Sequence, residues 1–174
     1  MHDFDQPASP WVTRFAPLIR PGGTVLDLAC GCGRNARMLA RRGWPVLAID
    51  RNRAALDSLH GEDGITTLLA DLENAPWPCS DRSFDAIVVC RYLHRPLFPL
   101  ILDSLAEDGV LIYETFMQGQ EKFGRPSNPD FLLQPDELLH AFSPALQVVA
   151  FEQGVVSEPT PQFLQRICAR RPAG

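Results

Sequence analysis

A glycine-rich turn followed by an acidic residue is the strongest chemical signal in this chain of 174 residues. The turn, residues 30–33, lies between an apolar run typical of a strand, 24–29, and a helical pattern, 35–42. Such a turn presents free backbone N–H groups to a ligand, and glycine permits close approach because it has no Cβ. Asp50 ends the next apolar run, where a carboxylate can accept both hydroxyls of a ribose. The pattern predicts a nucleoside-binding site.

Two ligand classes fit this turn. Residues 31–36 match G-x-G-x-x-A, the dinucleotide fingerprint. Against a dinucleotide, Asp27 lies within the first apolar run, where a pyrophosphate gains nothing from added negative charge, and Asp71 follows the third run. A nicotinamide-dependent reductase would also need a catalytic Tyr/Lys pair, and Lys122 is the only lysine. Asp85, which opens the fourth run, is interpreted as a structural residue with an exposed side chain.

The elements that must position these residues alternate along the chain. Strands that are apolar on both faces and alternate with helices indicate a parallel sheet covered on both sides. The predicted strands are 24–29, 45–49, 65–70, 84–90, 110–115, 146–151 and 163–169. The predicted helices are 35–42, 54–60, 97–106 and 135–142, after an N-terminal helical segment within residues 1–20. We therefore expect one α/β domain over residues 1–174.

Residues 116–134 interrupt this alternation with a long loop. Loops longer than about 12–15 residues in a compact domain are usually functional. This one follows the fifth predicted strand and mixes glycines with Phe116, Phe123 and Arg125. Glycine allows bending, the aromatic rings would exclude water from a reaction, and Arg125 would meet an anion. We expect a lid over substrate; the alternative is a surface loop packed permanently on the last helix.

Composition limits the remaining possibilities. The chain is 45% hydrophobic and 21% charged, with a net charge of −5 and a pI near 5.3, which argues against DNA as a partner. No apolar run approaches the ~20 residues of a membrane span, and residues 1–5 lack a secretory pattern. Five cysteines form no framework of spaced pairs, and Cys30 and Cys32 lack a second pair of metal ligands. We expect a cytoplasmic protein with reduced thiols and no metal or membrane partner.

The stretch Asp27-Leu28-Ala29-Cys30-Gly31-Cys32-Gly33 resembles the first motif, D/E-x-G-x-G-x-G, of the class I S-adenosylmethionine-dependent methyltransferases, with alanine replacing the first glycine. Four motifs in order carry this resemblance over residues 24–115. It implies a Rossmann-like, doubly wound sheet of seven strands, mostly parallel with an antiparallel last strand and helices on both faces. It also implies S-adenosylmethionine as the cofactor. Residues 92–97, 113–116 and 123–126 are similar to small, poorly characterised bacterial members.

The resemblance further implies roles for residues at the ends of the predicted strands. Asp27 would lie near the methionine part of the cofactor, with the backbone of 29–33 lining it. Asp50 would hold the ribose hydroxyls. Residues 71–72 would flank the adenine, whose amino group would donate to Asp71, and residues 90–91 would face the transferring methyl. The full set of expected cofactor-binding residues is Asp27, Ala29, Cys30, Gly31, Gly33, Asp50, Arg51, Asp71, Leu72, Cys90 and Arg91.

Two residues are candidates for proton transfer. His94, in the loop after the fourth strand, is a candidate general base because imidazole titrates near neutrality; the alternative is that it only starts the next helix. Glu114 ends the fifth predicted strand at the same edge of the sheet. The expected substrate-binding residues are Tyr92, His94, Phe123 and Arg125.

The expected reaction is in-line methyl transfer to a small-molecule acceptor. No N/D-P-P-Y/F signature follows the fourth strand, where residues 90–93 read Cys-Arg-Tyr-Leu, and this disfavours amino methylation of adenine, cytosine or glutamine. An RNA or protein methyltransferase working with a partner stays open, with Arg166, Arg170 and Arg171 as its candidate basic strip. A binding module without catalysis stays open as well.

Overall fold

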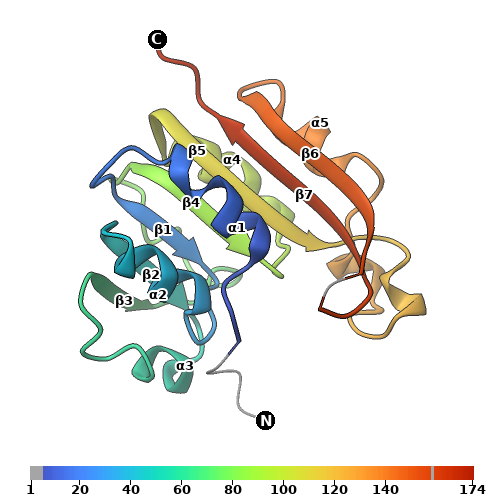
Figure 1. Cartoon of the computed structure of the whole chain (residues 1–174), viewed down its shortest axis with the longest axis horizontal. Coiled ribbons are helices and arrows are strands. Elements are labelled where there is room, and N and C mark those ends of the chain that lie inside the picture. Colours follow the sequence, from blue (N-terminus) through green and yellow to red (C-terminus); the bar gives the residue numbers. More distant parts are fainter. Residues whose placement is uncertain (1–5, 158) are drawn as a thin grey trace.

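One seven-stranded sheet organises the molecule (Figure 1). The computed structural model describes residues 6–157 and 159–174. The strand order is β3-β2-β1-β4-β5-β7-β6, and only β7 runs antiparallel to its neighbours. The strands are β1 Val25–Leu28, β2 Val46–Asp50, β3 Ile65–Leu69, β4 Phe84–Cys90, β5 Leu105–Phe116, β6 Gln147–Val156 and β7 Gln162–Arg170. This is the sheet predicted from the sequence.

Helices cover both faces of the sheet, as predicted (Figure 1). They are α1 Pro10–Phe15, α2 Arg34–Arg41, α3 Arg53–Asp57, α4 Phe98–Asp103 and α5 Glu137–Phe142. Short 3₁₀ turns occupy Ala16–Leu18, Arg95–Leu97, Gln120–Lys122 and Pro129–Phe131. Ser9 caps α1 by accepting backbone N–H bonds, and Pro10 occupies the first turn, where its missing N–H costs nothing. In the described part of the chain, no helix has the length and apolarity that crossing a membrane requires.

Alternation along the buried strands builds two separate cores. Leu26 and Ile87 point to the face that α4 and α5 cover, whereas Val25 and Val88 point to the face that α1 and α2 cover. Trp11 anchors α1 to the second face, where its indole N–H donates to the Ile167 carbonyl at 3.2 Å. The sheet is therefore clamped between helices, and its edge at the carboxyl ends of β1, β2 and β4 is positioned by burial on both sides.

The structure corrects several predicted boundaries. The helix predicted over 97–106 ends at Asp103, because Leu105 already pairs with Phe84 in the sheet. Strand β6 continues to Val156, five residues beyond the predicted end, because its hairpin with β7 is longer than the apolar pattern. In the N-terminal segment, α1 stops at Phe15 and continues as a 3₁₀ turn that contains Pro17.

Asp85 is structural, as predicted, but its side chain is buried and not exposed. It is 7% exposed, and its carboxylate accepts bonds from the Arg20 guanidinium and from the Thr24 N–H at 2.7 Å. A Cβ at Gly23 would lie 2.8 Å from the Asp85 Cβ, so glycine permits this approach. Burial raises the pKa of Asp85, but the bonds from Arg20 and Thr24 outweigh it and hold the pKa below its ordinary value.

We therefore expect Asp85→Asn to lower the free energy of unfolding by about 1–3 kcal/mol at pH 7. Because the folded pKa lies below the unfolded one, the charge stabilises the fold above about pH 4, and this stabilisation is lost as the pH falls through the folded pKa. Urea denaturation at pH 7 and pH 3 measures it, with exposed Asp103→Asn as the control. A gap between wild type and Asp85→Asn that is the same at both pH values would contradict the assignment.

Candidate active site

A cavity of about 230 Å³ lies where the strand order reverses, beyond the carboxyl ends of β1 and β4. In open α/β sheets, ligands bind at this position. We name it the turn cavity; it is lined by Gln6, Asp27, Ala29, Cys30, Gly31, Cys32, Arg34, Asn35, Cys90 and Arg91. Six of the eleven residues predicted for the cofactor therefore meet in one cavity: Asp27, Ala29, Cys30, Gly31, Cys90 and Arg91.

Left-handed backbone conformations shape this cavity. Ala29 has φ 54° and Arg91 has φ 55°, so a non-glycine residue adopts this conformation just after β1 and again just after β4. Such residues cost of order 1–3 kcal/mol and persist where the surroundings impose them, often at ligand sites. Ala29 occupies the position where the family motif has glycine, and the turn keeps the conformation that glycine would adopt.

The two glycines of the turn serve different purposes. A Cβ at Gly31, with φ 56°, would meet no atom within 4 Å, so this residue leaves open space at the wall of the turn cavity. A Cβ at Gly33 would lie 2.5 Å from the Leu59 Cδ2, so Gly33 allows α2 to begin against the chain that follows α3. Gly33 does not line the turn cavity, which makes its observed role one of packing.

Asp50 ties the end of β2 to the glycine turn. Its Oδ2 accepts the Gly31 N–H at 2.7 Å, and its Oδ1 accepts the Asn52 N–H at 2.8 Å. An ionised carboxylate offers about four acceptor positions, so two stay available to hydroxyl donors. The carboxylate thus lies beside the turn cavity and fixes the turn that forms its wall.

Asp27 is a buried carboxylate that lines the turn cavity. It is 1% exposed, and its Oδ2 has no hydrogen-bond partner among the described residues. Burial raises its pKa to about 7, although the Ala36 N–H and the Arg34 guanidinium act in the opposite direction. A buried, unpartnered carboxylate oxygen is costly, and a cation or a hydrogen-bond donor in the cavity would relieve that cost.

Two cysteines, Cys30 and Cys90, add uncharged thiols to the wall of the turn cavity. Burial raises the pKa of the Cys30 and Cys90 thiols, so both stay protonated at neutral pH. The Cys90 thiol donates to Glu114 Oε1 at 3.7 Å. Within the part of the chain that the structure describes, no group of three or more His, Cys, Asp and Glu residues is arranged to hold a metal ion.

Cys32 lines the cavity within the backbone stretch 29–33 that was predicted to line the cofactor, and three further lining residues were not predicted: Gln6, Arg34 and Asn35. Arg34 and Asn35 begin α2 directly after the glycine turn, and this position was a usable signal because the first turn of such a helix faces the ligand. Gln6 gave no signal. It reaches the cavity through tertiary structure, since the Asn35 Oδ1 accepts the Ser9 N–H at 2.9 Å and holds the N-terminal segment there.

The remaining predicted cofactor residues lie outside the turn cavity. Arg51 is exposed after β2, and Leu72 packs its side chain into the core on the α4 face. Asp71 forms a loop cap in which its carboxylate accepts the N–H groups of Glu73, at 2.9 Å, and Asn74. The Asn74 side-chain amide, followed by the Glu73 N–H, lowers the pKa of Asp71. This is the arrangement of a capping aspartate, and any contact with adenine stays a prediction.

The two candidates for proton transfer, His94 and Glu114, lie outside the lining of the turn cavity. Glu114 is buried, and the Cys90 thiol lies between its carboxylate and the cavity. His94 is half-buried and precedes the 3₁₀ turn Arg95–Leu97, where its carbonyl accepts the Leu97 N–H at 3.0 Å. Neither residue lines the turn cavity. Their catalytic roles stay predictions, and the backbone of His94 does start the next helical turn.

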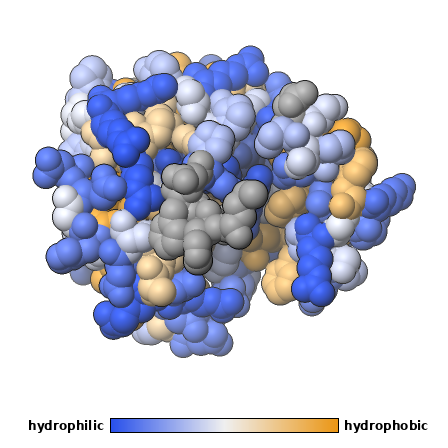
Figure 2. Space-filling view, turned by 60° about the horizontal axis from the view of Figure 1, so that its bottom comes forward, coloured by the Kyte–Doolittle hydropathy of each residue, from blue (hydrophilic) through white to orange (hydrophobic). Residues whose placement is uncertain are grey.

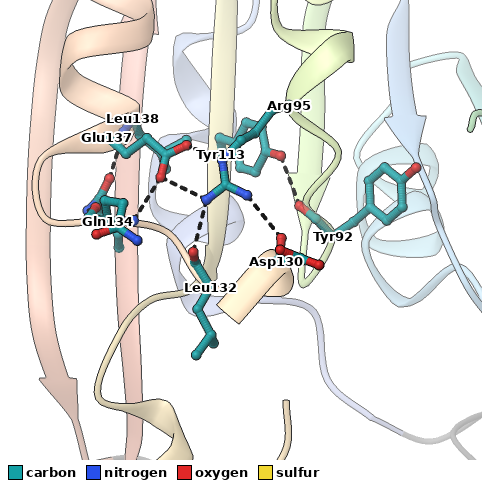
Figure 3. Close-up of polar contacts among 9 residues, drawn as sticks. Tyr92, Arg95, Tyr113, Asp130, Leu132, Gln134, Glu137 and Leu138 are labelled. Atoms are coloured by element: carbon teal, nitrogen blue, oxygen red, sulfur yellow. Dashed lines mark hydrogen bonds and ion pairs between the residues drawn. The ribbon is translucent and has the colours of Figure 1, made fainter. Parts of the chain in front are cut away.

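Hydrogen bonds fix the loop after β4 (Figure 3). The buried Tyr113 hydroxyl donates to the Tyr92 carbonyl at 2.9 Å. The Tyr92 hydroxyl donates to Glu73 Oε1 at 3.3 Å, so this predicted substrate residue connects the loop after β4 to the loop after β3. Burial, followed by the charge of Glu73, raises the pKa of Tyr92, so its hydroxyl is un-ionised at neutral pH.

Arg95 fastens the second half of the predicted lid to α5 (Figure 3). Its guanidinium forms an ion pair with Glu137 and donates to the carbonyls of Asp130, at 2.9 Å, and Leu132, at 3.0 Å. The first half is held by Gln120, which is 4% exposed and bonds the chain near β7. These anchors hold both halves of the segment, and its role as a lid over substrate stays a prediction.

Phe123 and Arg125 line a second cavity of about 420 Å³. We name it the loop cavity; it is lined by Arg91, Phe116, Gln120, Phe123, Arg125, Thr160, Pro161 and Gln162. Arg91 is common to both cavities. The predicted substrate residues of the long loop therefore lie next to the predicted cofactor residues.

Comparison with known proteins agrees with this geometry. Residues 25–107 match the family model of a methyltransferase domain. The cypemycin N-terminal methyltransferase of Streptomyces sp. is 38% identical over 76 residues, which are 44% of this chain and 29% of that protein. The chain thus spans less than a third of this curated relative.

Solved structures share the fold over nearly the whole chain. TehB from Haemophilus influenzae has a TM-score of 0.78 at 20% identity, covering 92% of this chain and 61% of TehB. The glycopeptide N-methyltransferase MtfA, solved with S-adenosyl-L-homocysteine, has a TM-score of 0.69 at 18% identity, covering 98% of this chain and 92% of that one. At these identities the likeness concerns the fold. It confirms the predicted fold, and residues 25–107 are similar to a methyltransferase domain.

The raised pKa of Asp27 generates a prediction for the protein without ligand. The folded state holds this proton up to about pH 7 and the unfolded chain only to about pH 4, so the free energy of unfolding falls as the pH rises between these values. Asp27→Asn removes this titration. Relative to wild type, the variant should gain up to about 4 kcal/mol between pH 4 and pH 8.

Urea denaturation at both pH values measures this gain, with the exposed Asp63→Asn as the matched control. Stability curves for wild type and Asp27→Asn that run parallel from pH 4 to pH 8 would show that Asp27 is ionised throughout.

Proposed function

We propose that this chain binds S-adenosylmethionine in the turn cavity and transfers its methyl group to a small-molecule acceptor. The observation that carries the proposal is the unpartnered Oδ2 of Asp27, which is buried in the wall of a cavity formed by a glycine turn. A carboxylate in this position suits the ammonium of an amino acid and repels a pyrophosphate. The choice of the methyl donor over a dinucleotide rests on this charge.

The other residues around the turn cavity fit the same cofactor. Asp50 keeps two acceptor positions for ribose hydroxyls. Gly31 presents a surface without a side chain, so a ligand can touch the backbone directly. The neutral thiols of Cys30 and Cys90 add no charge that would compete with the carboxylate for a cation. Asp71 and Leu72 are proposed to flank the adenine from the end of β3.

Methyl transfer of this kind depends on position more than on acid–base groups. When bound, S-adenosylmethionine would supply a methyl group on a sulfonium. The acceptor would take that methyl group in line as its bond to sulfur breaks, and S-adenosylhomocysteine would leave. The protein aligns the acceptor, and orientation alone supplies a large share of such accelerations. Arg91, in its left-handed conformation at the end of β4, lies between the two cavities and is proposed to direct the acceptor. His94 or Glu114 would take a proton only if the acceptor starts protonated.

A macromolecular acceptor is the second candidate. The strip expected for it is not available, because Arg166 pairs with Glu152 and lies over Trp11, while Arg170 and Arg171 donate to backbone carbonyls. A different group of arginines supports this candidate. A cavity of about 650 Å³ beside α2 is lined by Gln6, Pro7, Ala8, Arg34, Arg37, Met38, Arg41 and Arg42.

Fluorescence anisotropy with a labelled RNA oligonucleotide separates the two candidates. The small-molecule proposal expects a Kd for RNA weaker than about 100 µM at 150 mM salt. Proteins that bind nucleic acid non-specifically have Kd values of about 1–100 µM under such conditions. Salt-dependent binding that is lost in Arg41→Gln/Arg42→Gln would favour the macromolecular acceptor.

We expect Asp50→Ala to bind S-adenosylhomocysteine at least tenfold more weakly, equivalent to about 1.4 kcal/mol. The variant removes acceptors for two ribose hydroxyls and also the bond that holds the Gly31 N–H. Isothermal calorimetry measures the affinity, circular dichroism confirms folding, and Asp57→Ala on α3 is the control. Unchanged affinity in a folded Asp50→Ala variant would remove Asp50 from the site.

Catalysis is tested with tritium-labelled S-adenosylmethionine and the low-molecular-mass fraction of a bacterial extract. Wild type should transfer label to material in that fraction, and Asp50→Ala should transfer less at subsaturating cofactor. Tight cofactor binding without transfer to any fraction would support a binding module without catalysis.

A further inference from the structure

The loop cavity opens beside the turn cavity, and Arg91 lines both. Its other walls come from the start of the long loop and from the chain leading into β7. Figure 2 shows that this side of the molecule is mainly hydrophilic and has a hollow bordered by apolar side chains. A molecule bound in the loop cavity would therefore lie next to whatever occupies the turn cavity.

The charge of the loop cavity is unusual for this protein. Two arginines, Arg91 and Arg125, line it from separate segments, and no carboxylate occurs among its described lining residues. The whole chain has a net charge of −5, so a cavity whose described lining holds two guanidinium groups and no carboxylate is not a consequence of composition. Among the described residues, Arg125 forms no ion pair. Guanidinium groups bind carboxylates and phosphates through paired N–H donors.

Arg125 is held in place through its backbone. The Gln120 side chain donates to the Arg125 carbonyl at 3.2 Å and accepts the Phe163 N–H at 2.8 Å, so it fixes this part of the loop to β7. Gly119, with φ 109°, lets the loop lie on Phe163, because a Cβ there would approach the ring to 2.8 Å. The base of the Arg125 side chain is thus positioned, while its guanidinium stays exposed.

Aromatic rings also line the loop cavity and provide an apolar surface beside the arginines. Phe123 is 46% exposed, and its ring centroid lies 6.3 Å from that of Phe163. Phe116 lines the same cavity. An exposed phenylalanine beside an arginine favours a ligand with a flat apolar part next to an anionic group. The phenyl ring then packs on the apolar part, and the guanidinium pairs with the anion.

We infer that the loop cavity is the acceptor site and that the acceptor is a small aromatic or apolar molecule carrying a carboxylate or phosphate. This inference rests on the proposed function, since it takes the turn cavity as the place of the methyl donor. Arg125 and Arg91 bind the anionic group, Phe123 covers the apolar part, and the acceptor atom points toward the turn cavity.

The test uses the full chain saturated with S-adenosylhomocysteine and three probes of similar shape: phenyl phosphate, benzoate and neutral benzamide. Calorimetry or ligand-detected NMR measures their affinities. We expect at least one anionic probe to bind at least tenfold more tightly than benzamide, and the stronger of the two identifies the preferred group. Arg125→Gln should weaken that probe at least fivefold, Arg125→Lys should weaken it less, and Arg82→Gln, distant from the cavity over Phe84, should leave it unchanged.

Two controls keep the result specific. Arg125→Gln should retain the affinity of wild type for S-adenosylhomocysteine within twofold, which shows an intact fold and donor site. Phe123→Ala should weaken both anionic probes but not inorganic phosphate. If the wild type binds S-adenosylhomocysteine but binds all probes equally or none of them, or if Arg125→Gln has no effect, the acceptor class is wrong. Failure of the wild type to bind S-adenosylhomocysteine would overturn the proposed function and this inference with it.

Discussion

The hydrogen bond between the Gly31 N–H and the Asp50 carboxylate joins the two halves on which the site depends. It connects the end of β2 to the turn after β1, and this turn must hold Ala29 and Gly31 in left-handed conformations. Two backbone bonds hold the same turn, from the Cys30 N–H to the Ile49 carbonyl at 2.9 Å and from the Gly33 N–H to the Cys30 carbonyl at 3.0 Å. Together these bonds shape the wall of the turn cavity before α2 begins, and Asp50 lies beside that cavity. Asp50 thus has a structural role in addition to the ribose contact proposed for it.

In the loop that precedes α5, buried polar side chains likewise hold irregular backbone in place by hydrogen bonds. Gln165 is fully buried, accepts the Leu138 N–H at 2.6 Å and donates to the Gln134 carbonyl at 3.0 Å. Arg95 satisfies carbonyls in the loop that precedes α5. Buried backbone groups outside strands and helices need such partners. These bonds explain how a long loop stays ordered at both ends while its exposed middle, around Phe123 and Arg125, is available to a ligand.

Local signals predicted the sheet and the turn, whereas features built by distant contacts escaped them. Strand β4 was predicted with its observed bounds because Phe84–Cys90 is an almost continuous apolar run, which is buried as far as Val89. The glycine turn carries its own conformational signature. In contrast, the buried state of Asp85 depends on Arg20, 65 residues away, and the position of Gln6 depends on a bond between Ser9 and Asn35. Gly33 shows the limit most clearly: the sequence identified a required glycine, but only the structure shows that Leu59 is what requires it.

The distribution of charge across the two cavities gives the site a direction. The carboxyl groups of Asp27 and Asp50 lie at the turn cavity, and the guanidinium of Arg125 lies at the loop cavity, with Arg91 between them. In a partly enclosed site such charges act more strongly than they would in water. In the proposed reaction, a bound cationic donor would stabilise the ionised form of Asp27 on one side, and Arg125 would favour an anionic acceptor on the other. The opposed charges and the shared wall at Arg91 would then set the places of donor and acceptor at the sheet edge.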